Sequence, residues 1–163
     1  MFELCPLDKQ MHSHKLNGPG VKRELAVCIK SSLIAWINGP FIGGKHDSII
    51  FREALTNHLF EDEAVECDAG YGKDRKLRTP DIGDSRAERK MKADVRAQHE
   101  AVNGRLKQFN VLTTHFRHMK PNREGMMKKH KICFFAVAVI TQLKFMHGMR
   151  TFDAGVNYDV AYW

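Results

Sequence analysis

The chain is poor in cysteine, and its few cysteines stand far apart. Cys5, Cys28, Cys67 and Cys133 form no closely spaced pair within the 163 residues. Zinc knuckles and disulfide frameworks bring cysteines together in pairs. The spacing therefore argues against both, and we expect reduced thiols in an intracellular protein.

Long apolar runs are also lacking. The longest run, Ile132–Ile140, has nine residues, whereas a membrane-spanning helix needs about 20. We therefore expect a buried helix there and no membrane partner. The N-terminus shows no charged segment followed by an apolar one, so a secretion signal is not expected. The sequence also has no internal repeat and no low-complexity stretch.

Charge is distributed unevenly along the chain. Residues 1–68 carry 7 basic and 10 acidic residues, residues 69–131 carry 17 and 7, and the remainder is neutral. An excess of ten positive charges in one segment is typical of a protein that binds a polyanion, most often nucleic acid. A solvated charged surface is the alternative interpretation. The apolar share of 43% and the charged share of 28% are those of a globular domain.

Two apolar, β-branched segments near the N-terminus predict a hairpin. They are Leu25–Ile29 and Leu33–Ile37, separated by Lys30-Ser31-Ser32. A glycine-rich loop follows, and then Asp47-Ser48 opens a helix that either residue could cap. A short strand over Ala64–Cys67 is expected to deliver Asp68 at its end.

Two long helices are predicted in the second half, at about 86–109 and about 126–146. On the first, Glu100 lies nearly opposite an apolar stripe of helical period, which consists of Met91, Val95, Val102, Leu106 and Phe109. On the second, we expect a core stripe of Phe134, Phe135, Val137, Ala138 and Leu143. We expect one domain over residues 1–147 and a tail over 148–163.

Three acids stand out by their settings. Asp47 follows the glycine-rich loop, Asp68 ends a strand, and Glu100 lies on a helix about thirty residues later. Carboxylates are the ligands that Mg²⁺ prefers, and two metal ions can activate a water and stabilise a leaving oxygen in phosphodiester cleavage. Plainer roles stay open. Asp47 could cap a helix, Asp68 could form a turn, and Glu100 could pair with Arg96 or Lys107.

Four segments in sequence order resemble PIF/Harbinger-type DDE nucleases. Asp47 ends a segment similar to the "GPxxG…D" block of that family, Asp68 lies in one similar to its "aDxGY" block, and Glu100 lies in one similar to its "E-x-x-x-x-x-L-K" helix. The segments are His12–Gly20, Trp36–Asp47, Glu66–Tyr71 and Gln98–Lys107.

This resemblance implies an RNase H-like α/β fold, a mixed sheet flanked by helices. It implies DNA cleavage or strand transfer with a divalent cation, Mg²⁺ or Mn²⁺, and Asp47, Asp68 and Glu100 as the matching catalytic and metal-binding positions. It also implies a nuclear location and DNA as the partner, with target choice left to a separate DNA-binding protein. We expect phosphate contacts from the basic segment, at Lys73, Arg75, Lys76, Arg78, Arg96 and Lys107.

One departure from the family concerns its first acid. In the family this acid lies on a first strand upstream of the position of His12. Asp8 is the sole aspartate before His12, and Pro6-Leu7-Asp8-Lys9 does not look like that strand. We therefore expect the first strand to be missing and the activity to be weakened or lost. The alternative is a non-catalytic DNA- or protein-binding remnant of a transposase.

Overall fold

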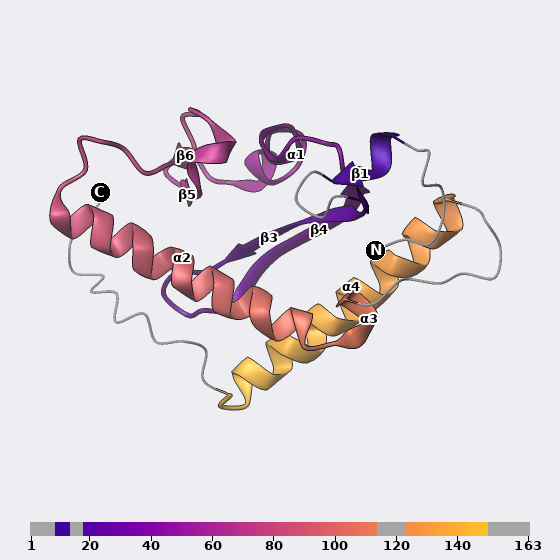
Figure 1. The fold of residues 1–163 in the computed structure, drawn as a ribbon. Helices are drawn as coiled ribbons and strands as arrows, with labels where there is room; N and C mark the ends of the chain where they lie inside the picture. The colour runs from indigo at the N-terminus through magenta and orange to yellow at the C-terminus, as the bar shows by residue number, and fades with distance from the viewer. Residues whose placement is uncertain (1–8, 14–17, 114–122, 150–163) are drawn as a thin grey trace.

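The computed structural model describes residues 9–13, 18–113 and 123–149, which form a mixed α/β arrangement (Figure 1). Asp8, His14 and residues 150–163 of the expected tail lie outside these ranges. The elements follow in the order η1 (Lys9–Met11), β1 (His12–Ser13), β2 (Gly18–Pro19), β3 (Val21–Val27), β4 (Ile34–Ile42), α1 (Asp47–Glu53), η2 (Leu55–His58), β5 (Val65–Glu66), η3 (Ala69–Tyr71), β6 (Leu77–Arg78), α2 (Arg86–Lys107), α3 (Asn110–Thr113) and α4 (Arg123–Met146).

The central element is the antiparallel hairpin of β3 and β4, which confirms the hairpin prediction. Its strands are paired from Val21 with Ile42 to Val27 with Ile34. The chain reverses at Ser32, a non-glycine residue at φ 59°, where the Ser32 amide donates to the Cys28 carbonyl at 2.8 Å. Within the described residues, β1 and β2 form a second antiparallel pair, and β5 and β6 form a parallel one.

The hairpin separates two hydrophobic clusters. Leu25 and Ile37 pack on one side against the cluster formed by α2 and α4, while Ala26 and Trp36 pack on the other against α1, β5 and β6. This division follows from the alternation of side chains across a strand. Figure 1 shows the hairpin between α1, β5 and β6 above it and α2 and α4 below it.

Helix α2 begins at a capping box. The Ser85 hydroxyl accepts from the Glu88 amide at 3.2 Å, and the Glu88 carboxylate accepts from the Ser85 amide at 2.7 Å. Its buried residues are Val95, Gln98, Val102 and Leu106. The apolar stripe predicted from the helical period is therefore confirmed at its centre, and Met91 and Phe109 lie half-buried at its ends.

Helix α4 is attached to the hairpin by polar contacts as well as by packing. The Arg23 guanidinium donates to His130 Nε2 at 2.7 Å, and the Gln142 carboxamide oxygen accepts from the Ile34 amide at 2.9 Å. Burial lowers the pKa of His130 to about 4, so the ring is neutral at pH 7 and can accept this hydrogen bond. The expected α4 stripe is confirmed for Phe134, Val137 and Ala138, but Leu143 is 49% exposed and the prediction was wrong there.

Phe134 should contribute most to the stability of the α4 side. Its side chain is 2% exposed, packs with Leu106 and Val137, and lies 4.7 Å beneath the Arg23 guanidinium. We expect Phe134→Ala to lower the free energy of unfolding by about 3–5 kcal/mol, because a buried aromatic leaves a cavity. Urea denaturation measures this change. Phe60→Ala is the matched control, since Phe60 is 74% exposed, and it should change stability by less than about 0.5 kcal/mol.

Candidate functional site

Asp47 lies in the first turn of α1, on the side of the hairpin that faces β5 and β6. Its carboxylate pairs with Lys22 Nζ at 3.0 Å and remains 49% exposed. The sequence predicts that Asp47 or Ser48 caps this helix, and this prediction was wrong. His46 caps the helix instead, because its Nδ1 accepts from the Ser48 amide at 3.3 Å.

The glycine-rich loop before Asp47 has a steric role. A Cβ atom on Gly43 would lie 2.6 Å from the Met11 carbonyl oxygen and 2.8 Å from that of Gly20. No other residue fits this approach without a backbone shift. The loop therefore joins the end of β4 to the N-terminal segment and fixes where α1 begins.

Asp68 lies two residues after the end of β5, a strand shorter than the Ala64–Cys67 strand that the sequence predicts. Its carboxylate accepts from the Gly70 amide at 2.8 Å and so caps the short helix η3. The parallel pairing of Val65 with Leu77 and of Glu66 with Arg78 holds β5 in place. Asp68 is exposed, so its carboxylate has access to solvent while it serves as a cap.

Tyr71 connects these two acids electrostatically. Burial raises the pKa of Tyr71 most, and the charges of Asp47, Asp68, Cys67 and Glu24 raise it further. Asp47 and Asp68, which are 21 residues apart in the sequence, thus act on one phenol. We refer to Glu24, Asp47, Asp68 and Tyr71 as the Tyr71 cluster.

Glu24 is a member of this cluster that sequence reasoning missed. It is 7% exposed on β3, and its carboxylate accepts from the Trp36 indole nitrogen at 2.7 Å. Burial raises the pKa of Glu24, while the hydrogen bond from Trp36 opposes that shift. The available signal was an acid directly before the apolar segment Leu25–Ile29.

Glu100 does not join the Tyr71 cluster. It is exposed on α2, away from the face formed by Val95, Gln98 and Val102, which agrees with its predicted position opposite the apolar stripe. In the described ranges, no three side chains of His, Cys, Asp or Glu are grouped so that they could hold a metal ion. Two of the three family-matched acids, Asp47 and Asp68, thus lie within electrostatic range of Tyr71.

Most of the basic residues expected to contact phosphate present their side chains to solvent. Lys73, Arg75 and Arg78 are exposed around β6, and Arg96 and Lys107 are exposed on α2. Lys76 differs, because its ammonium donates to the Leu59 and Phe60 carbonyls at 2.7 and 3.0 Å. It therefore holds the η2–β5 connection to β6 and is a weak candidate for an external partner.

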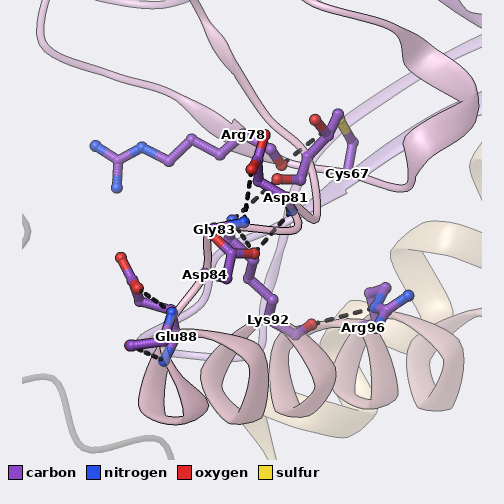
Figure 2. A network of polar contacts seen from close by, with 10 residues as sticks. Cys67, Arg78, Asp81, Gly83, Asp84, Glu88, Lys92 and Arg96 are labelled. Carbon is purple, nitrogen blue, oxygen red and sulfur yellow. Dashed lines mark hydrogen bonds and ion pairs between the residues drawn. The ribbon is translucent and has the colours of Figure 1, made fainter.

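A polar network joins the loop after β6 to the first turns of α2 (Figure 2). Lys92 Nζ donates to both carboxylate oxygens of Asp84 and to the Thr79 carbonyl, each at 2.9 Å. The Asp81 amide donates to Asp84 at 2.8 Å, and together with Lys92 it holds the pKa of Asp84 below its usual value. The network thus fixes the path of the loop between Arg78 and α2.

A cavity of about 460 Å³ lies beside this network. Its lining carries both signs of charge, with three cations and four acids: Lys73, Arg78, Lys92, Glu66, Asp74, Asp81 and Glu88. Two of the exposed basic residues therefore border one hollow between β6 and α2. The mixed lining neutralises part of their charge, so the cavity itself is not a purely basic site.

No protein-family model, no curated protein and no solved structure matches the chain. Within the described residues, no helix combines the length and the apolar character that crossing a bilayer requires.

The Tyr71 cluster makes a testable electrostatic claim. We expect Asp47→Asn to lower the pKa of Tyr71 towards its usual value, because one of the negative charges that oppose phenolate formation is removed. Phenolate absorbance during an alkaline titration measures this pKa, and subtracting the spectrum of the matching Tyr71→Phe protein removes the other tyrosines. Asp62→Asn, in an exposed loop, is the control and should leave the titration unchanged. An equal shift in both variants would contradict the cluster.

Proposed function

We propose that the chain is a DNA-binding domain of the DDE nuclease type. The observation that carries the DNA-binding part is the exposure of Lys73, Arg75 and Arg78 together with the outer face of α2. That helix has seven basic and three acidic residues. Contacts of this kind to phosphate supply affinity without sequence information. A nuclear location and a separate protein that selects the target belong to the same proposal.

The order of the elements supports an RNase H-like fold within this proposal. An antiparallel hairpin is followed by a helix, then by a parallel strand pair, and then by a long helix. In the family that the sequence resembles, the strand that carries the first acid would complete the sheet.

Metal-dependent cleavage is the activity that the resemblance implies, and the carboxylates support it in part. Asp47 and Asp68 supply hard oxygen atoms of the kind that Mg²⁺ or Mn²⁺ requires, and both act electrostatically on Tyr71. Glu100 lies apart on the outer face of α2, so the three acids as arranged do not fit a complete two-metal site. Cleavage therefore requires Glu100, or another acid, to be brought to the Tyr71 cluster.

A second candidate function is DNA binding without turnover. It is favoured by the local roles of the same acids, since Asp47 pairs with Lys22 and Asp68 caps η3. Both roles stabilise the fold without any metal ion. The two candidates share the DNA-binding surface and differ in whether the carboxylates act on the bound strand.

DNA binding should be sensitive to salt and tolerant of sequence. If six phosphates are neutralised, the logarithm of the binding constant falls with the logarithm of salt concentration at a slope of about −5, roughly −0.9 per contact. Fluorescence anisotropy with two unrelated duplexes measures this slope. The triple variant Lys73→Gln, Arg75→Gln, Arg78→Gln should reduce the slope to about −2.5. Lys30→Gln, in the exposed hairpin turn, should leave it unchanged. Salt-independent binding would reject this electrostatic account.

A nicking assay separates the two candidate functions. If the chain is a nuclease, supercoiled DNA is nicked in Mg²⁺ or Mn²⁺, and Asp68→Asn and Glu100→Gln each lower the rate by a factor of about 100 or more. Asp62→Asn should retain the full rate. Binding without nicking in either metal would support the non-catalytic candidate. Nicking that persists in both variants would show that these acids are not the catalytic ones.

A further inference from the structure

A contact between two basic side chains joins β3 to the first half of α4. The Arg23 guanidinium donates to His130 Nε2 at 2.7 Å and lies 4.7 Å from the centroid of the Phe134 ring. His130 is 3% exposed and Phe134 is 2% exposed, so little solvent reaches the imidazole. Because the arginine can only donate, the contact depends on a histidine nitrogen that is free of a proton.

Arg23 keeps its charge at this contact. Burial lowers the pKa of its guanidinium to about 10, which still leaves it protonated at pH 7. In the described part of the chain, no carboxylate forms an ion pair with Arg23, and its Nε is buried without a hydrogen-bond partner. A protonated His130 would therefore place a second cation against an arginine whose charge no described acid balances.

The other groups around His130 do not offset this repulsion. Besides Arg23, the N-terminal amino group acts on the ring, and its charge is also positive. Strand β4 and helix α3 contain no titratable residue. The N-terminal segment that packs on α4 contributes His12, which can only add positive charge. On α4 itself, Lys129 and Lys131 are exposed beside His130.

The second half of α4 is attached through a group that does not titrate. The Gln142 carboxamide oxygen accepts from the Ile34 amide at 2.9 Å. Helix α2 packs on α4 through Leu106, while Arg105 and Lys107 beside it are exposed. Acid should therefore weaken the attachment of α4 at His130 and leave the attachment at Gln142 in place.

We propose that the Arg23–His130 contact is a proton-sensitive switch, which holds the first half of α4 on the hairpin while His130 is neutral and releases it when His130 is protonated. Release separates Phe134 from the Arg23 guanidinium and opens the cluster that Phe134 forms with Leu106. The second half of α4 stays attached through Gln142, so the movement is confined to residues 123–134.

The direction of the pH dependence follows from the two states of the ring. In the attached helix, burial most of all and then the charges of Arg23 and the N-terminus lower the pKa of His130 to about 4. In the released helix, the pKa of the solvated imidazole returns to about 6.5. The released state thus binds the proton more tightly. Attachment is therefore complete above about pH 6.5 and is lost as the pH falls towards about 4.

Hydrogen–deuterium exchange of the full chain at pH 7.5 and pH 5.0 measures the release, after correction for the intrinsic effect of pH on amide exchange. We expect residues 123–134 to lose protection by about tenfold or more at pH 5.0, because proton uptake favours the released helix. Residues 135–146 and helix α2 should keep their protection within about twofold. This comparison uses the wild-type chain, so it does not depend on how a variant folds.

Three variants assign the effect to this contact. The carboxamide of His130→Gln can accept from Arg23 but takes up no proton in this range, so residues 123–134 should exchange equally at both pH values. Arg23→Gln removes the cation and should make the loss of protection at pH 5.0 smaller. His12→Gln is the matched control, because it replaces the histidine of the N-terminal segment that packs on α4, and it should lose protection as the wild type does.

The switch would be overturned by equal protection of residues 123–134 at both pH values in the wild type. An equal loss over residues 123–134, residues 135–146 and α2 would show that acid unfolds the whole domain instead. A loss in His130→Gln as large as in the wild type, or its disappearance in His12→Gln, would assign the proton to another group.

Discussion

The β3–β4 hairpin must bury both of its faces, because Leu25 and Ile37 project to one side and Ala26 and Trp36 to the other. A two-stranded sheet is at best marginally stable in water, so each face needs a cover. Helices α2 and α4 cover one, and α1 with β5 and β6 covers the other. The hairpin therefore sets the position of both covers, and with them the surfaces that they carry.

This division explains how the family-matched acids are distributed. Asp47 and Asp68 belong to the cover that packs on Ala26 and Trp36, and the charges of both act on Tyr71 there. Glu100 belongs to the helix that packs on the other cluster, through Leu106, and it faces solvent. Bringing Glu100 to the other two acids would require α2 to turn about its axis or to shift along the hairpin. DNA binding by exposed cations needs no such movement.

Sequence patterns predicted these elements and part of their burial. The hairpin follows from two apolar, β-branched segments around a short break. The long helices and the outward position of Glu100 follow from the helical period of 3.6 residues. Glu24 was missed because groups that surround it, such as the Leu55 backbone and His58, come from a segment more than thirty residues later. The prediction that Leu143 is buried was wrong because α4 is apolar on both faces. The spacing of its apolar residues therefore does not reveal which face meets the hairpin. His46 was missed as a cap because histidine is an uncommon one.

The DNA-binding surface is the claim on which the proposed function rests, and lysine footprinting tests it most directly. The chain would be acylated with and without duplex DNA at low salt, and each lysine quantified by mass spectrometry. The account predicts that DNA protects Lys73 and Lys107, that Lys30 reacts equally in both samples, and that Lys76 reacts slowly throughout because carbonyl groups hold its ammonium. Unchanged reactivity of Lys73 and Lys107 in a sample saturated with DNA would contradict the account.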